Sequence, residues 1–444
     1  MRLIRFVVSL SLFIFSFSSS LADQGKNIVV NYKDSDLPLL EKWNRARTGA
    51  TGTDYENGFW IGYSIEKLMG KNSFIGSYSS DWKEKTKLSE IIYGKNRDAE
   101  EQNLSEEEVI RHVAEETLDD FAVLENEEKV VKEIALLFRF SGSRRPEKLR
   151  LTNLDLHFEL DDLPLVWLGR VEDKESIDLL TKLYGKLSDV NIKKDIVFAV
   201  STHDLPSRVV PFLRGVVKSN EDIEIRKSAI FWLGQQNSPE AIRIVVDAAN
   251  SGRSSEIREG AVFAISQFKS EQATDKLIDL ALNSRHDDVR EKAIFWLGQK
   301  NTPKALNALL KIIKKEDSEA LKEKAVFSIS QMSSCEAVDA LIELARNAVP
   351  YSVRKKALFW LGQKASQKAA KALGDVVYSD KEIEIQEYAV FALYQLPNKN
   401  GIPALIRIST DHPSPRIRKK ALFWLGQTDD PRAVEAIVKI LKRR

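Results

Sequence analysis

Few residues of this chain have types and spacings that could do chemistry. Two histidine–aspartate pairs occur, His203-Asp204 and Asp411-His412, but neither has a nucleophile at a recognisable spacing. The single cysteine, Cys335, follows Ser334 at the expected start of a helix, where thiols can be activated, but no base or second thiol accompanies it. Nucleophile-elbow, phosphate-loop and dinucleotide-binding motifs are absent. The sequence therefore predicts a protein that is not an enzyme.

Composition excludes several other classes of protein. The chain has 444 residues, of which 43% are hydrophobic, and its 67 basic residues nearly balance 65 acidic ones. Such a chain is too apolar for a disordered tail and too balanced in charge for a uniformly basic nucleic-acid binder. One cysteine and five widely separated histidines provide no zinc-binding spacing. We therefore expect no nucleic acid, no metal ion and no cofactor.

The first 22 residues have the composition of a secretory signal peptide. Arg2 and Arg5 precede an apolar stretch at residues 6–17, and Ser20-Leu21-Ala22 supplies small residues before a cleavage point. The apolar stretch is shorter than the ~20 residues that span a bilayer, and an uncleaved anchor is the alternative. The sequence predicts an exported protein, periplasmic or secreted, with no membrane span after cleavage.

Charge is unevenly distributed along the chain that would follow residue 22. Residues 23–205 carry 26 basic and 36 acidic side chains, whereas residues 206–444 carry 39 basic and 29 acidic ones. Such a split marks either the footprint of a charged partner or ordinary solvated surface. The sequence leaves both interpretations open.

A repeat of 32 residues dominates the second part of the sequence. The motif Phe-Trp-Leu-Gly-Gln at 231–235 returns at 295–299, 359–363 and 423–427, and related motifs lie midway between these copies. The phenylalanines that begin the seven motifs are residues 231, 263, 295, 327, 359, 391 and 423. Two degenerate copies precede them, at 166–170 and 198–202. About nine units are therefore predicted over residues 161–444.

Each unit has the pattern of two helices. Ser238-Pro239, Thr302-Pro303 and Asp430-Pro431 each place a capping residue before a proline at the first helical position. A polar turn then leads to a second helix such as 289–297, and Gly298 is expected to help end that helix. Two short helices cannot bury their apolar faces alone, so the units are predicted to stack into a solenoid.

The repeated pattern [Val/Ile]-Arg-x-x-Ala-x-x-x-Leu-Gly, followed by Pro-x-Ala, resembles the HEAT-like repeats of phycobilisome lyases. The resemblance implies a mainly α fold, a right-handed α-α superhelix of the armadillo type. Its second helices would line a concave face that serves for contacts between proteins. The bilin-attachment activity of the lyases is not implied.

Positions in the second helix are counted from Ile225 as position one. Positions one, five, eight and nine fall on one face, which is the predicted core. Position seven is always phenylalanine, and we expect it to pack on an aliphatic side chain of the neighbouring unit; an exposed groove for a partner is the alternative. Position eight alternates between tryptophan and alanine or serine, which predicts a packing period of two units.

Two polar positions also recur in the second helix. Position eleven is glutamine in all seven complete units, and its amide is expected to satisfy backbone groups at helix ends, with a row of amides facing a ligand as the alternative. Position two is usually arginine, and the family resemblance implies that it pairs with loop acids such as Asp288.

Positions three and four are predicted to be the most exposed. The candidate partner-binding residues come from these positions and from the arginines directly before them at position two, Arg354 and Arg418. We select the basic residues Lys227, Arg354, Lys355, Lys356, Arg418, Lys419 and Lys420. Their charge predicts a partner protein with an acidic surface.

Residues 23–160 lack the repeat and are predicted to form a small α+β region with antiparallel strands. Residues 59–65 and 74–78 have the pattern of a hairpin, residues 134–140 and 149–159 that of two more strands, and the acidic segment after Ser105 that of a helix. This region either caps the apolar end of the solenoid or is an independent binding module.

The combined prediction is a non-enzymatic scaffold of the cell envelope that binds another protein on the concave face of its solenoid. The alternative is a catalytic or carbohydrate-binding amino-terminal domain to which the solenoid is an accessory. A third possibility is association of the basic carboxy-terminal end with anionic lipid. The sequence does not indicate an oligomeric state.

Overall fold

The computed structural model describes residues 29–31, 37–50, 55–76, 86–94, 128–141, 145–347 and 350–442. The chain divides into two compact units with the boundary after Phe212. The predicted signal peptide and the acidic helix expected after Ser105 lie outside the described residues.

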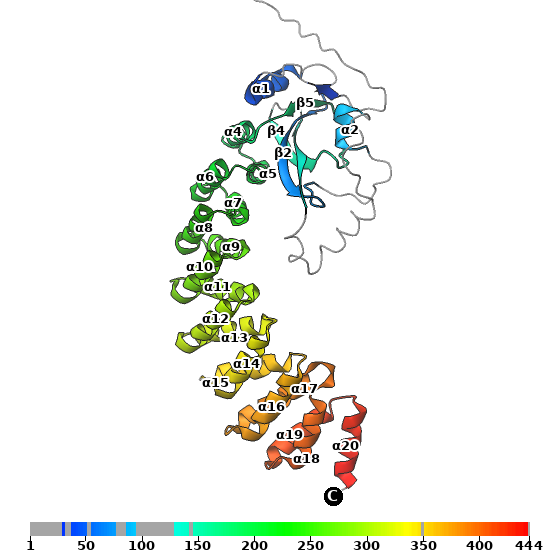
Figure 1. Ribbon diagram of the computed structural model, residues 1–444, viewed down its shortest axis with the longest axis vertical. Helices are drawn as coiled ribbons and strands as arrows, with labels where there is room; N and C mark the ends of the chain where they lie inside the picture. Colours follow the sequence, from blue (N-terminus) through cyan, green and yellow to red (C-terminus); the bar gives the residue numbers. More distant parts are fainter. Residues whose placement is uncertain are drawn as a thin grey trace, which may run out of the picture. The chain divides into compact units, whose positions relative to one another are not determined.

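Unit 1 contains a five-stranded mixed sheet (Figure 1). Its strands are β1 (Val29–Asn31), β2 (Phe59–Gly70), β3 (Lys129–Phe140), β4 (Pro146–Asn153) and β5 (Leu165–Arg170). The order across the sheet is β1-β5-β2-β3-β4. Strand β5 runs parallel to both of its neighbours, whereas β2 with β3 and β3 with β4 are antiparallel. The expected antiparallel strands are therefore present as β2, β3 and β4, but β5 makes the sheet mixed.

The predicted hairpin between residues 59–65 and 74–78 is wrong. Strand β2 pairs with β3 along its whole length, from Phe59 opposite Phe140 to Gly70 opposite Lys129. Ile75 instead exchanges hydrogen bonds with Asn153, at 2.7 Å to the side-chain oxygen and 2.8 Å from the backbone amide. Local turn residues could not reveal this pairing, because the partner strand is distant in sequence.

The first degenerate repeat copy, residues 166–170, is a strand rather than part of a helix pair. It forms β5, whose Leu165 and Trp167 are buried. Strands therefore continue to Arg170, beyond the predicted limit at residue 160, and the helix pairs begin at Asp173. A buried parallel strand reads as a continuous apolar run, which periodicity alone does not distinguish from a buried helical segment.

Helices pack on both faces of the sheet. Successive residues of a strand point to opposite faces, so Phe138 and Leu137 belong to different sides. On the first side lies α1 (Leu39–Gly49), whose Trp43 ring is centred 4.8 Å from the Phe138 ring. On the second side lies α2 (Leu88–Tyr93), whose buried residues cluster with Leu137. Burial of apolar side chains on both faces stabilises unit 1.

A buried polar chain connects β2 to the first helix pair, α4 (Asp173–Tyr184) and α5 (Val190–Ser201). The Tyr63 hydroxyl lies 2.9 Å from Ser176 Oγ, which lies 2.7 Å from His203 Nε2. His203 Nδ1 is 2.8 Å from the carbonyl oxygen of Ala199. Every group has a partner when His203 is neutral, because Nδ1 then donates and Nε2 accepts. Burial lowers the pKa of His203 and raises that of Tyr63.

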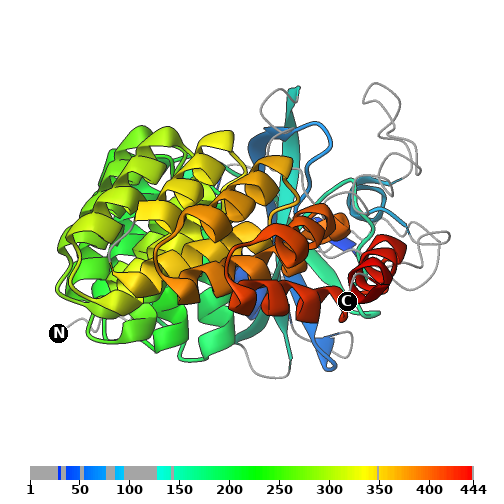
Figure 2. The same ribbon diagram turned by 90° about the horizontal axis from the view of Figure 1, so that it is seen from below.

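Eight helix pairs and a final helix are described from Asp173 onward (Figures 1 and 2). After α4 and α5 they are α6 (Pro206–Lys218), α7 (Ile223–Gln235), α8 (Pro239–Ser251), α9 (Ser255–Gln267), α10 (Glu271–Asn283), α11 (Asp287–Lys300), α12 (Pro303–Lys315), α13 (Glu319–Gln331), α14 (Cys335–Asn347), α15 (Tyr351–Gly362), α16 (Gln367–Ser379), α17 (Ile383–Gln395), α18 (Ile402–Asp411), α19 (Pro415–Leu425) and α20 (Pro431–Lys442). The repeat therefore forms the predicted solenoid of stacked helix pairs.

The predicted caps begin the first helices. Ser238 Oγ accepts a hydrogen bond from the Ala241 amide at 3.1 Å, and Thr302 Oγ1 accepts one from the Ala305 amide at 3.2 Å. Each bond satisfies one of the amides that have no partner in the first helical turn. The arginine at position two pairs with an acid, as the resemblance implies, but the acid belongs to the next second helix rather than to a loop: Arg258 lies 2.7 Å from Asp288, in the first turn of α11.

Close approach of neighbouring second helices explains the two-unit period. A Cβ atom on Gly298 would lie 2.7 Å from the backbone oxygen of Ser328, and one on Gly234 would lie 2.9 Å from that of Ala264. The glycine at position ten of one unit thus faces the small residue at position eight of the next. Gly298 does not end its helix as predicted, since α11 continues to Lys300.

Candidate partner-binding face

Positions three, four, seven and eleven of the second helices in unit 2 form an exposed surface, which we call the second-helix face. Positions one, five and nine are buried as predicted, for example Ile225, Ala229 and Leu233 in α7. Position eight is core where it is small, but its tryptophans, such as Trp296, are only half-buried. Part of each tryptophan ring therefore reaches solvent.

The aromatic rings form a regular row. Trp296 has its ring centre 5.1 Å from both Phe263 of the preceding unit and Phe295 of its own helix. Trp360 and Trp424 each lie between two phenylalanines in the same way, at 4.9–5.1 Å. Ring pairs at such distances interact favourably beyond their area of burial. The phenylalanines thus contact tryptophan, a partner that we did not predict.

Three of these phenylalanines are exposed. Phe231 and Phe359 are each 37% exposed, and Phe423 is 54% exposed. The prediction that neighbouring aliphatic side chains cover position seven is wrong at these three residues, because α7, α15 and α19 each leave the ring open to solvent. The alternative derived from the sequence, an apolar surface at position seven, describes them better.

A groove of about 480 Å³ crosses α7, α9, α11 and α13 on this face. Aromatic side chains line it, namely Phe263, Phe295, Trp296 and Phe327. Charged side chains also line it, namely Lys227, Glu256, Glu259, Glu291, Lys292 and Lys324. An apolar hollow with polar borders is the usual composition of a site that binds another molecule.

The charges beside the groove neutralise one another. Lys292 lies 3.0 Å from Glu259, and Lys324 lies 2.5 Å from Glu291. Lys356 continues the series with Glu323 at 3.1 Å. In each pair the lysine at position four meets the glutamate at position three of the preceding unit. These exposed pairs add little to stability, but they leave little net charge along this part of the face.

The seven candidate basic residues have different surroundings. The two arginines bind loops: Arg354 pairs with Asp380, and Arg418 donates to the carbonyl oxygen of His412 at 2.6 Å. Three of the lysines have partners within the chain: Lys227 donates to Glu224 at 2.9 Å, Lys356 pairs with Glu323, and Lys355 lies over the rings of Tyr351 and Tyr388. The other two, Lys419 and Lys420, line a separate hollow. The structure thus brings only the last two together at one hollow.

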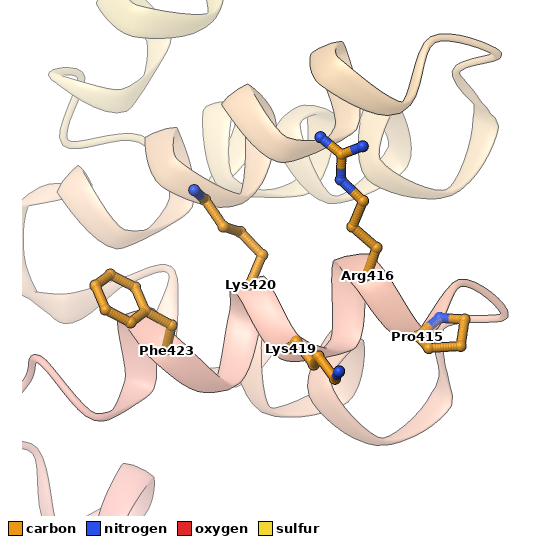
Figure 3. A pocket seen from close by; sticks show the side chains of 5 residues that line it. All are labelled: Pro415, Arg416, Lys419, Lys420 and Phe423. Carbon is orange, nitrogen blue, oxygen red and sulfur yellow. The ribbon is translucent and has the colours of Figure 1, made fainter.

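That hollow lies on α19 and has a volume of about 510 Å³. Pro415, Arg416, Lys419, Lys420 and Phe423 line it. Figure 3 shows Arg416 and Lys420 extending to the same side of the helix, Lys419 to the other side, and Phe423 about one turn further along. Arg416 donates to both carboxylate oxygens of Glu387 on α17, and these hydrogen bonds lower the pKa of Glu387.

Glutamine at position eleven does not have its predicted role in the described residues. The amides of Gln267 and Gln331 bond the serine that precedes each of them, and Gln363 Nε2 bonds Gln395 Oε1 at 3.1 Å. Lysine at position twelve satisfies the backbone instead. Lys300 Nζ donates to the Phe268 carbonyl oxygen at 2.8 Å, and burial lowers the pKa of Lys300. The sequence feature that could have indicated this role is a lysine directly after the repeated glutamine, at residues 300 and 364.

The residues first considered for chemistry are not assembled into a site. His203 is buried in the polar chain described above, His412 Nε2 lies 3.0 Å from the Val377 carbonyl oxygen, and Cys335 is exposed. Among the residues that the structure describes, no three histidine, cysteine or acidic side chains are grouped to hold a metal ion. Within the same residues, no helix combines the length and apolar character needed to cross a bilayer.

Stacked helix pairs with a 32-residue period define an α-solenoid repeat protein. The family model for HEAT repeats matches residues 210–294, 274–362 and 370–444, together about half of the chain. The chain therefore belongs to the HEAT repeat family, whose solenoids are typical of protein-interaction scaffolds. A search of curated protein sequences found no match.

Several solved structures are similar to this chain. Human deoxyhypusine hydroxylase is 16% identical, with 57% of this chain and 96% of that chain covered and a TM-score of 0.26. The CpcE–CpcF phycocyanin lyase complex from Nostoc is also 16% identical, with 53% and 92% covered and a TM-score of 0.27. Importin beta is 14% identical, with 57% and 38% covered and a TM-score of 0.32.

Proposed function

We propose that this protein is a non-enzymatic scaffold that binds another protein on its second-helix face, the face that the family resemblance implies is concave. The observation that carries the proposal is the aromatic groove over α7–α13, together with the exposed rings of Phe231 and Phe359. Contiguous apolar surface bordered by polar residues marks sites of protein association. Aromatic side chains supply much of the binding energy at such sites.

The location that we propose is the cell envelope. The support is the arrangement of Arg2, Arg5 and the apolar residues 6–17 at the amino terminus. The alternative function, a catalytic or carbohydrate-binding amino-terminal region, stays a prediction.

Capture of the partner tests the proposed function. The chain without residues 1–22 is immobilised and exposed to envelope extract, beside a Phe231→Ser, Phe359→Ser variant. Because both rings are already partly exposed, the variant is expected to fold normally and to lose the partner. Val434→Ser is the matched control, since Val434 is an exposed apolar residue of α20, a helix that does not belong to the second-helix face. Equal retention by all three proteins, or by none of them, would contradict the proposal.

A further inference from the structure

The hollow on α19 combines unpaired positive charge with an exposed aromatic ring. Its ring is Phe423, the most exposed phenylalanine of the second-helix face at 54%. Lys419 and Lys420 lie about one turn before it on the same helix (Figure 3). The groove over α7–α13 has similar aromatic side chains but neutralised borders, so the two sites differ chiefly in charge.

The charge at α19 is not compensated as it is elsewhere on the face. The lysines at position four of α11, α13 and α15 each pair with a glutamate of the preceding unit. At α19 the corresponding glutamate is Glu387, and Arg416 occupies both of its oxygens at 2.6 and 3.1 Å. Among the described residues, Lys420 has only a longer-range attraction to Glu387, and Lys419 has no ion pair. Arg416 and Lys420 therefore share the single carboxylate of Glu387, and Lys419 has no acidic partner among the described residues.

The chemistry of these groups selects the kind of anion. A guanidinium fork suits a phosphate group, but the fork of Arg416 is already bound to a carboxylate. What remains is two flexible ammonium groups beside an apolar ring. Carboxylates can pair with each ammonium group separately, while an aromatic side chain placed between them packs on Phe423. A peptide segment in which acidic and aromatic residues alternate provides both groups.

We propose that the hollow on α19 binds an acidic segment of the partner protein. Carboxylates of that segment contact Lys419 and Lys420, and an aromatic side chain of the segment packs on Phe423. The proposal rests on the proposed function and adds the chemical character of the partner. It also separates Lys419 and Lys420 from the other five candidate basic residues, which are bound within the chain.

A labelled synthetic peptide tests this inference with the chain lacking residues 1–22. The probe is Gly-Glu-Glu-Phe-Glu-Glu-Phe-Glu-Gly, and its binding is followed by fluorescence anisotropy. We expect Lys419→Gln with Lys420→Gln to weaken binding about tenfold and to reduce its dependence on salt. Phe423→Ser is expected to weaken binding without changing the salt dependence. The matched control is Lys304→Gln with Lys368→Gln: these lysines lie on first helices, pair with Asp275 and Asp339, line neither hollow, and should leave binding unchanged.

Three further probes identify the ligand class. A peptide with glutamine in place of glutamate should not bind, and inorganic phosphate and phosphatidylglycerol vesicles should bind no better to the native chain than to the Lys419→Gln, Lys420→Gln variant. Binding of vesicles or phosphate that depends on these lysines, without peptide binding, would overturn the proposal. Peptide binding that the two substitutions leave unchanged would also overturn it.

Failure here is distinguishable from failure of the proposed function. If the captured envelope partner is lost by the Phe231→Ser, Phe359→Ser variant but retained by the Lys419→Gln, Lys420→Gln variant, the scaffold proposal stands and the acidic-segment proposal is wrong. If neither variant loses the partner, both proposals are wrong.

Discussion

Single glycines decide how closely successive second helices approach. Gly298 leaves no space for a Cβ atom, because Ser328 of the next unit presents its backbone oxygen and its Cβ atom within 3 Å. Gly260 also lies in a second helix, α9, yet a Cβ atom there would meet nothing within 4 Å. The packing of neighbouring helices therefore requires glycine at position 298 but not at position 260, although both residues lie inside helices.

Replacement of these glycines by alanine should change stability in opposite directions. Gly298→Ala forces the backbones of α11 and α13 apart, and we expect it to lower the free energy of unfolding by about 1–3 kcal/mol. Gly260→Ala adds helix propensity without a clash, and should raise it by about 0.5–1 kcal/mol. Urea unfolding followed by circular dichroism measures both. A stabilising Gly298→Ala would show that the two helices are not in close contact.

At the scale of elements, the buried chain from Tyr63 through Ser176 to His203 holds β2 against α4 and the end of α5. With neutral His203, Nδ1 donates to the Ala199 carbonyl oxygen and Nε2 accepts from Ser176, so protonation of the ring would force the bond to Ser176 to reverse its direction. Burial lowers the pKa of His203, while the charge of Asp173 raises it and that of Lys67 lowers it. The balance keeps the ring neutral in the folded protein.

This arrangement predicts that unit 1 loses stability in mild acid. The folded pKa lies below the ordinary value of 6.5, so the unfolded chain binds more protons when the pH falls below about 6.5. Stability is complete above that pH and declines below it. We expect hydrogen exchange in β2 and α4, corrected for its intrinsic pH dependence, to rise between pH 7.5 and 5.5. The rise should be much smaller in His203→Gln; an equal rise in that variant would assign the effect to other groups.

At the scale of the whole molecule, unit 2 is a series of helix pairs that contact mainly their neighbours. Stability in such a protein is nearly a sum over units and their interfaces. The final helix, α20, has one fully buried residue, Ala433, whereas Val434, Val438 and Leu441 are exposed. Central helices such as α13 are packed on both sides and bury six residues.

Protection from hydrogen exchange should therefore vary along unit 2. We expect α20 to exchange fastest and the helices α11–α15 to exchange slowest, because local opening is easiest where few side chains are buried. Mass spectrometry of peptic fragments measures this gradient. Uniform protection from α7 to α20 would show that unit 2 unfolds as one cooperative body rather than as neighbouring units.

The sequence alone determined the repeat, its helix pairs, their caps and most of their core. Residues such as Ser238, Thr302 and Ile225 act within one or two turns of chain, so their types and spacing specify their structure. The pairing of the position-two arginines with acidic residues, such as Arg258 with Asp288, followed from the family resemblance. The glutamate–lysine pairs also leave a pattern in the sequence: a glutamate at position three is followed 33 residues later by a lysine, as in Glu259 and Lys292.

Only the tertiary structure decided the remaining features. Strand β5 and the β2–β3 pairing depend on segments far apart in the chain, and an apolar run such as 165–170 fits either a strand or a helix until its neighbours are known. Likewise, Lys356 and Lys420 occupy the same position in their helices, yet the first is paired and the second is not, because Arg416 already binds Glu387. Local chemistry specifies an element, whereas the availability of a side chain depends on what the fold places beside it.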